Sequence, residues 1–167
     1  MYFYLKSFRI LLISFIITLL YGCSSINMKD FENKTPKLNL FEFFKGETVA
    51  YGIFEDRFGK LRRQFRVKIN GSVNQNILTL DEKFIYDDGE KATRIWKIEK
   101  TNDNENFVKY QGSADDVEGL ATGSSVGNAL NWTYDIYLNM KGSNLKVKFD
   151  DWIFKQDDNV AINRAYV

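Results

Sequence analysis

The sequence has no histidine, one cysteine and one proline. Without histidine, Ser-His-Asp and Cys-His catalysis are excluded, and so are metal sites with histidine ligands. Because Cys23 is the only cysteine, an intramolecular disulfide is excluded and the fold must be stabilised by burial of its core. The net charge is only +1 and both signs are interspersed, so we expect no nucleic-acid partner. No sequence motif indicates a cofactor or a metal site.

The N-terminus lacks the run of about 20 apolar residues that a membrane-spanning helix needs. Its apolar segment, Ile10–Leu20, is shorter and follows two basic residues, as in a secretory signal. The phrase Leu20-Tyr21-Gly22-Cys23 comes next and resembles a bacterial lipobox, in which the cysteine becomes the lipidated first residue of the mature chain. We therefore interpret residues 1–22 as a signal peptide and Cys23 as the lipidation site. An uncleaved membrane anchor is the alternative.

The residues after the cysteine predict where the mature protein is found. Ser24 stands where an aspartate would favour retention at the inner membrane, so we expect an outer-membrane lipoprotein that faces the periplasm of a Gram-negative cell. Residues 23–40 are mostly polar and contain the only proline, which is typical of a tether. We expect one β-domain over residues 41–167, attached to the membrane through its N-terminal lipid.

Aromatic residues make up 16% of the chain, and apolar and polar positions alternate through most of it. From Asn128 to Arg164, alternating segments separated by polar turns predict three antiparallel strands. The same pattern upstream, with hairpin signals such as Asn70-Gly71, gives eight or nine strands and no convincing helical period. We predict an all-β fold, a single antiparallel meander closed into a lipocalin-like barrel, because closure removes exposed strand edges. A β-sandwich is the alternative.

Several phrases spread along the mature chain resemble one family of Gram-negative lipoproteins. They are Thr35-Pro36-Lys37-Leu38, Leu40-Phe41-Glu42-Phe43-Phe44-Lys45-Gly46, Tyr51-Gly52-Ile53, Tyr86-Asp87-Asp88-Gly89, Gly127-Asn128-Ala129-Leu130-Asn131-Trp132, Phe149-Asp150-Asp151-Trp152, Gln156-Asp157-Asp158 and Asn163-Arg164-Ala165. The chain is similar over nearly its whole mature length to the domain-of-unknown-function family numbered 3833. The resemblance implies no established activity and no catalytic residues. Members usually continue past the last of these phrases into a further strand, so the resemblance implies that a C-terminal strand is lacking here.

Adjacent acidic residues recur along the chain. The pairs are Asp81-Glu82, Asp87-Asp88, Asp115-Asp116, Asp150-Asp151 and Asp157-Asp158. Paired carboxylates can serve a glycosidase or bind calcium, but no spacing here matches a calcium loop. Most of the pairs lie in or beside predicted turns, where aspartate is favoured. We therefore interpret them as solvated turn residues.

Five side chains are candidates for contact with a ligand. They are Trp96, Trp132, Tyr134, Trp152 and Arg164. Aromatic rings of this kind can stack on a ligand, and ordinary core packing is the alternative interpretation. The arginine would bind a ligand carboxylate if it points inward.

The orientation of Arg164 follows from alternation along the last predicted strand. Strict alternation places it on the same face as Val160 and Ile162, which we take to be the inward face because it is apolar. An inward guanidinium needs a partner, and a short turn before this strand would bring Asp150 or Asp151 opposite it. A bulge at these two aspartates would keep the following aromatic residues inward. We expect a structural ion pair, with a ligand-carboxylate site as the alternative.

Three functions remain open on the sequence alone. We prefer a lipid-anchored protein that binds or carries a small apolar molecule, such as a fatty acyl lipid, inside a small barrel. The second is a structural lipoprotein with a filled core that docks to an envelope complex. The third, an enzyme that acts on lipid or glycan with carboxylates alone, is the least favoured because no nucleophile or metal motif is present. The oligomeric state is not indicated.

Replacing the candidate lipidation site tests the interpretation of the leader. We expect Cys23→Ala to prevent lipid attachment, because the cysteine sulfur is the atom that carries the lipid in a lipoprotein. The variant should remain uncleaved at the inner membrane or become soluble in the periplasm, which membrane fractionation measures. If Cys23→Ala protein still fractionates with the outer membrane, the lipobox interpretation is wrong.

Overall fold

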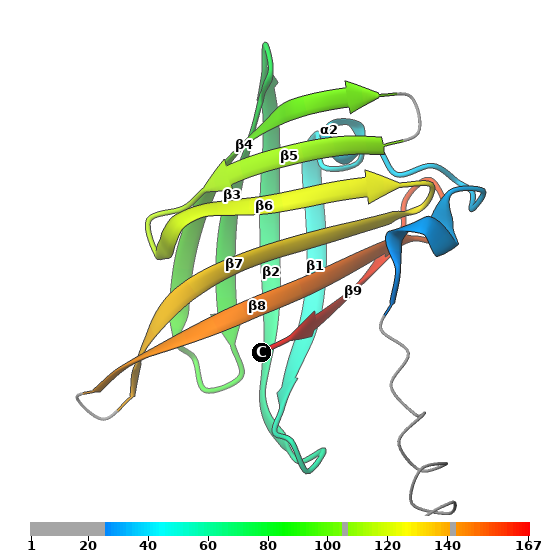
Figure 1. The fold of residues 1–167 in the computed structure, drawn as a ribbon. Coiled ribbons are helices and arrows are strands. Elements are labelled where there is room, and N and C mark those ends of the chain that lie inside the picture. The colour runs from blue at the N-terminus through cyan, green and yellow to red at the C-terminus, as the bar shows by residue number, and fades with distance from the viewer. Residues whose placement is uncertain (1–25, 105–106, 141–142) are drawn as a thin grey trace, which may run out of the picture.

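The computed structural model describes residues 26–104, 107–140 and 143–167. Within these ranges the chain forms nine β-strands and two short helical segments (Figure 1). The strands are β1 (Gly46–Glu55), β2 (Leu61–Asn74), β3 (Ile77–Tyr86), β4 (Lys91–Asn104), β5 (Phe107–Ser113), β6 (Val117–Val126), β7 (Ala129–Met140), β8 (Ser143–Lys155) and β9 (Ala161–Tyr166). The helical segments are the 3-10 turn η1 (Met28–Phe31) and the α-helical turn α2 (Leu40–Phe43).

All nine strands belong to one antiparallel sheet, and their order in the sheet is their order in the chain. The sheet curls into a half-barrel, in which the later strands cross over β1–β3 (Figure 1). The predicted all-β, lipocalin-like meander is confirmed, and because there is one sheet the sandwich alternative is wrong. Within the described ranges β1 and β9 each pair with one strand only, so no backbone ladder joins the two edges.

The curl brings together strands that a flat sheet would keep apart. Trp96 on β4 and Tyr134 on β7 have ring centroids 5.2 Å apart, although β5 and β6 lie between them in the sheet. In a flat sheet, three strand spacings would separate the two backbones by about 14 Å, since neighbouring strands lie about 4.8 Å apart. Side chains of β4 and β7 therefore meet across the concave side of the half-barrel.

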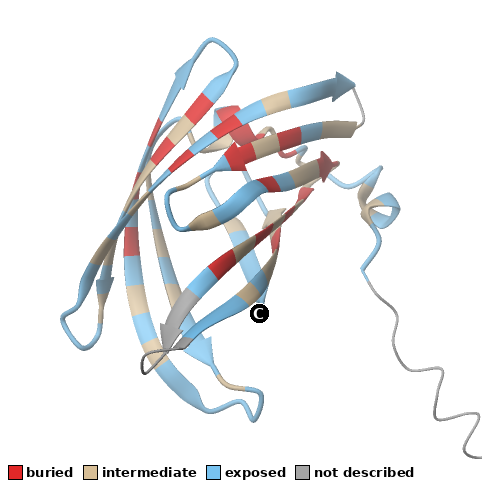
Figure 2. Ribbon diagram, turned by 60° about the vertical axis from the view of Figure 1, so that its left-hand side comes forward, coloured by how far each residue is buried: buried red, intermediate tan, exposed pale blue. Residues whose placement is uncertain are grey.

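One end of the half-barrel is filled by apolar side chains. α2 lies at this end (Figure 1) and buries Leu40 and Phe41. The helix begins after Asn39, whose side chain accepts a hydrogen bond from the Phe41 N–H at 3.2 Å. The Phe41 ring stacks on Tyr110, a fully buried residue of β5. Buried residues gather toward this end, whereas exposed and half-buried residues dominate the opposite half of the strands (Figure 2).

Two glycines on the concave face make room for Trp132. A Cβ atom at Gly112 would lie 2.8 Å from the Trp132 ring, and one at Gly123 would lie closer still. These distances are too short for a contact between carbon atoms, so both positions need glycine for close approach of the ring. The indole therefore packs directly against the backbone of β5 and β6.

The described part of the expected tether packs against the sheet. The Phe31 ring of η1 lies 6.0 Å from the Trp152 ring and 5.5 Å from the Phe154 ring, measured between centroids. Further along, Leu38 is buried, and its backbone N–H donates to the carbonyl oxygen of Gly127 at 2.7 Å. Apolar contacts and a backbone hydrogen bond thus fix this segment on the domain.

The domain boundary expected at residue 41 is therefore too late, because the chain already belongs to the fold at η1. The expected signal peptide, residues 1–22, and the lipidation site Cys23 lie outside the described residues. Of the helices in the described ranges, none has both the length and the apolar character needed to cross a membrane.

Candidate functional site

The concave face holds three of the five side chains predicted to contact a ligand. Trp96, Trp132 and Tyr134 all lie there and are buried. The Trp96 ring meets the Trp132 ring edge to face at 5.5 Å, and it meets the Tyr134 ring in the same way at 5.2 Å. Because all three are more than nine-tenths buried, they form a wall of the core and leave little surface for a ligand.

Trp152 lies on the opposite, convex face, which corrects its predicted place in a ligand site. Asp151 pairs with Trp132 in the β7–β8 ladder and so shares its concave face. Successive side chains of a strand point to opposite faces, so Trp152 points outward. It is nevertheless buried, because the rings of Phe31 and Phe154 cover it.

Arg164 is also on the convex face, and the predicted ion pair with an aspartate does not form. Arg164 is exposed and lies opposite Trp152 in the β8–β9 ladder. Its guanidinium carbon lies 4.3 Å from the centroid of the Tyr166 ring. Asp150 shares this face but lies opposite Tyr166, and Asp151 points to the other side of the sheet.

The geometry of the turn before β9 explains why Arg164 lies opposite Trp152 and not opposite an aspartate. Asp157 accepts hydrogen bonds from the N–H groups of Asn159 and Val160, both at 2.8 Å, so β9 begins only at Ala161. The β7–β8 register also runs without a shift, so the expected bulge at Asp150-Asp151 is absent. The apolar face of the last strand is therefore the convex one.

The sequence interpretation missed a group of polar side chains on the concave face. Glu82 on β3 lies directly across from Arg94 on β4. Asp116, from the turn between β5 and β6, forms an ion pair with this arginine. Asp151 on β8 and Tyr134 on β7 approach from the facing wall. The charge of Asp151 is close enough to raise the pKa of both Glu82 and Tyr134. We call these five residues the concave polar cluster.

The interpretation of all acidic pairs as solvated turn residues is thus wrong for the second member of two pairs, whereas Asp116 does lie in a turn and is exposed. Glu82 and Asp151 lie inside strands, and Asp151 is only 8% exposed. A signal was present in the sequence. Glu82 takes the apolar phase between Leu80 and Phe84, and Asp151 likewise follows Phe149 on the same face. A carboxylate in the buried phase of a strand indicates a specific environment rather than a turn.

Arg94 is the centre of the concave polar cluster. Its guanidinium donates from Nε at 3.0 Å and from Nη2 at 2.6 Å to one oxygen of Asp116. The guanidinium carbon lies 5.8 to 6.0 Å from the ring centroids of Phe84, Trp96 and Tyr134, within the range of cation–π attraction. Burial alone would lower the pKa of Arg94, but the hydrogen bonds to Asp116 and the neighbouring groups raise it above its usual value. The arginine is therefore charged.

The other two carboxylates of the cluster hold protons more tightly than usual. Burial raises the pKa of Glu82 to about 7, while Arg94 opposes the rise and Asp116 and Asp151 add to it. Burial also raises the pKa of Asp151 to about 6, opposed by Tyr134 and Arg94. At neutral pH the cluster therefore carries one positive charge and more than one negative charge.

Beyond the cluster, toward the open end, the concave lining is aromatic and incompletely covered. The Phe65 ring lies 5.0 Å from Phe54, 6.0 Å from Phe84 and 5.9 Å from Tyr86 between centroids. Phe54 is 42% exposed, and the other three rings are half-buried. Phe149 adds a half-buried ring from the facing strand β8. We call Phe54, Phe65, Phe84 and Tyr86 the open aromatic wall.

An arginine forms the rim of this wall. The Arg63 guanidinium carbon lies 3.6 Å from the Tyr86 ring centroid, and Arg63 forms ion pairs with Asp88 at 2.8 Å and Glu90 at 2.5 Å. Among the described residues its Nε atom is buried without a hydrogen-bond partner. The rim is therefore charged on its solvent side and apolar on the side of the concave face.

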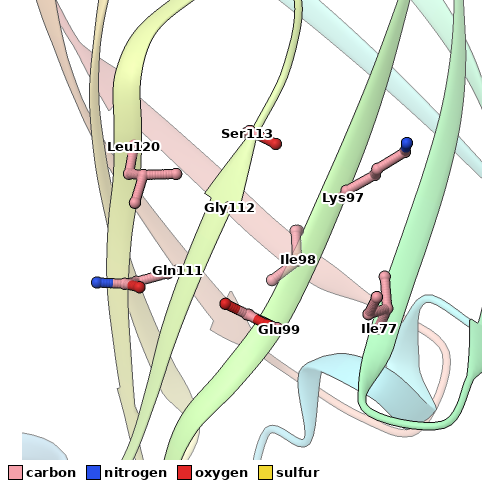
Figure 3. A pocket seen from close by; sticks show the side chains of 8 residues that line it. All are labelled: Ile77, Lys97, Ile98, Glu99, Gln111, Gly112, Ser113 and Leu120. Carbon is pink, nitrogen blue, oxygen red and sulfur yellow. The ribbon is translucent and has the colours of Figure 1, made fainter.

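The convex face offers only shallow hollows. One of about 190 Å³ lies over β4, β5 and β6, and Figure 3 shows the side chains of Lys97, Gln111 and Leu120 around it. A second hollow, of about 310 Å³, lies over β4 to β7 among polar side chains such as Lys109 and Thr133. Ligand sites usually bury most of their occupant and are lined mainly by apolar groups, whereas both of these hollows are open to solvent. Within the described residues, no group of three or more potential ligands is arranged to hold a metal ion. The concave face is therefore the stronger candidate for a site.

Replacing Glu82 tests the buried charge. Because the pKa of Glu82 is raised in the folded protein, the folded state binds more protons than the unfolded chain between about pH 4 and pH 7. The free energy of unfolding therefore falls as the pH rises through this range. We expect Glu82→Gln to leave the free energy of unfolding nearly unchanged at about pH 5. At about pH 8 it should raise that free energy by roughly 1 to 3 kcal/mol, because one unit of pKa shift corresponds to about 1.4 kcal/mol.

Urea unfolding at both pH values measures this difference. The matched control is Asp81→Asn, on the convex side of the same strand, which should show no such dependence on pH. A Glu82→Gln variant that is destabilised equally at both pH values would contradict the raised pKa.

The chain was also compared with known proteins. A search of curated proteins and of solved structures found no match. A family model described as "Protein of unknown function (DUF3833)" matches residues 17–167. This range includes all nine strands and both helical segments, so the match covers the whole described domain. The resemblance carried by the sequence phrases is confirmed, and the chain belongs to the DUF3833 family.

Proposed function

We propose that this protein is a lipid-anchored envelope lipoprotein whose concave face binds a small apolar ligand with a fatty acyl chain. The observation that carries the proposal is the open aromatic wall. Its four rings contact one another on the concave side of a curled sheet, and Phe54 remains 42% exposed. An apolar surface of this kind is stabilised when a ligand excludes water from it.

The shape of the half-barrel limits where such a chain can lie. The end near α2 is filled by Leu40, Phe41 and the indole of Trp132, so a ligand would not enter there. The opposite half is lined by half-buried rings and is open between β1 and β9. A linear acyl chain in this half would remove apolar surface from water, which stabilises the complex by about 25 cal/mol per Å² buried. Small β-barrels commonly bind ligands in their interiors or mouths.

The membrane attachment in this proposal rests on the leader and on Cys23. Only residues 24–27 lie between Cys23 and η1, and four residues span at most about 14 Å. Because Phe31 of η1 packs on Trp152, a lipid on Cys23 would hold the domain close to the membrane surface. The site would then be near the bilayer, which is a source of acyl chains.

A second candidate function is docking to another envelope protein. It is favoured by β1, an edge strand whose convex side exposes Val49, Tyr51 and Ile53, with Tyr51 78% exposed. Open edges with apolar side chains attract further strands or partners. This function would use the convex side and the edge of the sheet, whereas the acyl-chain site uses the concave face. Substitutions on the two faces therefore distinguish the two functions.

Removing a ring of the open aromatic wall tests acyl-chain binding. Dodecanol, a neutral single-chain probe, should change the intrinsic tryptophan fluorescence saturably, because Trp96 contacts the Arg94 guanidinium that also lies against Phe84 of the wall. We expect Phe54→Ala to weaken binding about tenfold, or ~1.4 kcal/mol, through lost apolar contact. Phe58→Ala is the matched control, since Phe58 is 80% exposed in the β1–β2 turn and should leave the affinity unchanged.

Native mass spectrometry of the purified protein provides a second readout. If the folded protein shows neither a saturable fluorescence change nor a bound probe, the concave face does not bind acyl chains and docking becomes the better proposal. Equal effects of Phe54→Ala and Phe58→Ala would place the chain somewhere other than the open aromatic wall.

A further inference from the structure

The proposed acyl-chain site leaves the head group of the ligand unassigned, and the inference about this head group rests on that site. We infer that the concave polar cluster binds a positively charged head group, an ammonium carried on the acyl chain, with Glu82 and Asp151 as its counter-ions. The open aromatic wall would then hold the chain, and the cluster at its inner end would hold the charge.

The first support is the position of the cluster relative to the wall. Glu82, Phe84 and Tyr86 follow one another on the concave face of β3, and residues two apart on a strand are spaced by about 6.8 Å. The Phe84 ring also lies 6.0 Å from the Arg94 guanidinium carbon, so the wall and the cluster are in contact. An amphiphile lying along β3 would place its chain on the rings and its head beside Glu82.

The second support is the balance of charge. Arg94 is the one cation of the concave polar cluster, and both of its hydrogen bonds to carboxylate go to Asp116. Asp151 is only 8% exposed, and within the described residues no ion pair engages it or Glu82. Arg94 thus offsets only part of the charge of three carboxylates, and an ammonium head group would supply a further counter-ion.

The third support is the aromatic surroundings. The rings of Phe84, Trp96 and Tyr134 already attract the guanidinium of Arg94. Phe149 stacks on Tyr134 with centroids 5.0 Å apart and planes only 4° from parallel, so a further ring face lies next to Asp151. Aromatic faces combined with carboxylates are the chemistry that recognises ammonium groups.

An anionic head group fits the same place less well. A fatty-acid carboxylate near Glu82 and Asp151 would meet like charges in a poorly solvated site. The remaining N–H donors of Arg94 would be open to it, but a carboxylate there would lie beside Glu82, which is directly across from Arg94, and near Asp116. The expected order of affinity is therefore ammonium first, neutral alcohol second and carboxylate last.

Protonation of the cluster sets the pH dependence of this preference. The charged and titratable groups that face Glu82 are Arg94 on β4, Asp116 in the β5–β6 turn and Asp151 on β8, with Tyr134 on β7 beside Asp151. The pKa of Glu82 is raised to about 7 and that of Asp151 to about 6, so both carboxyls become neutral as the pH falls. Ammonium binding should weaken between about pH 8 and pH 5, while alcohol binding should not.

The experiment compares probes that share one chain length. The purified full chain is titrated at about pH 7.5 with dodecylammonium, dodecanol and dodecanoate, followed by tryptophan fluorescence and native mass spectrometry. We expect dodecylammonium to bind about tenfold more tightly than dodecanol. Glu82→Gln combined with Asp151→Asn should remove this ratio, whereas Asp81→Asn, on the convex side of β3, should retain it.

The outcomes separate this inference from the proposed function. Equal affinities for dodecylammonium and dodecanol would overturn the head-group inference and leave the acyl-chain site standing. Tighter binding of dodecanoate would also overturn it and assign the head group to Arg94. No binding of any probe by the folded protein would overturn both proposals.

A fourth probe distinguishes the source of the ammonium group. Lysophosphatidylethanolamine carries its amine on a phosphodiester, whereas dodecylammonium is a free amine. If lysophosphatidylethanolamine binds and depends on Glu82, the inference holds and the source is a phospholipid head group. If only dodecylammonium binds with this dependence, the inference holds for free alkyl amines. An affinity of either probe that is insensitive to Glu82 and Asp151 counts against the inference.

Discussion

The ion pair between Arg94 and Asp116 is the interaction on which the concave face depends. It joins β4 to the turn between β5 and β6 and keeps the guanidinium over the rings of Phe84 and Tyr134. Arg94 is also the only positive charge in the cluster that offsets the raised pKa of Glu82. Arg94 is largely buried whereas Asp116 is partly exposed, so loss of Asp116 would leave a poorly solvated guanidinium without its hydrogen-bond acceptor. The filled end of the half-barrel and the open aromatic wall meet at Arg94.

The sheet architecture could be predicted from the sequence because alternation is a local property. Each strand shows its period of two. The hairpin predicted at Asn70-Gly71 is wrong, however, because both residues lie inside β2 and the chain reverses at Gln75-Asn76. Alternation identifies the two faces of a strand but does not say which one the fold covers. Trp152 shows this limit, because its cover is Phe31, far away in the sequence. The inward orientation predicted for Arg164 failed for the same reason.

The concave polar cluster was not predicted because its members come from separate parts of the chain. Glu82 and Asp151 are about seventy residues apart, and they face one another only because the sheet curls. Adjacent acids such as Asp150-Asp151 also resemble turn residues, although Asp150 points to the convex side and Asp151 into the half-barrel. By contrast, Trp96, Trp132 and Tyr134 were predicted as a set, because each occupies the apolar phase of a clear strand.

Glu82 and Asp151 share a poorly solvated site with Arg94 at the inner end of the apolar concave face. The most direct test is a pH titration of the side-chain carboxyl carbons by NMR, with resonances assigned through the loss of each signal in Glu82→Gln and Asp151→Asn. We predict a pKa of about 7 for Glu82 and about 6 for Asp151, with each substitution shifting the other titration. Independent titrations near pH 4 for both carboxyls, the ordinary range for solvated Asp and Glu, would contradict this prediction.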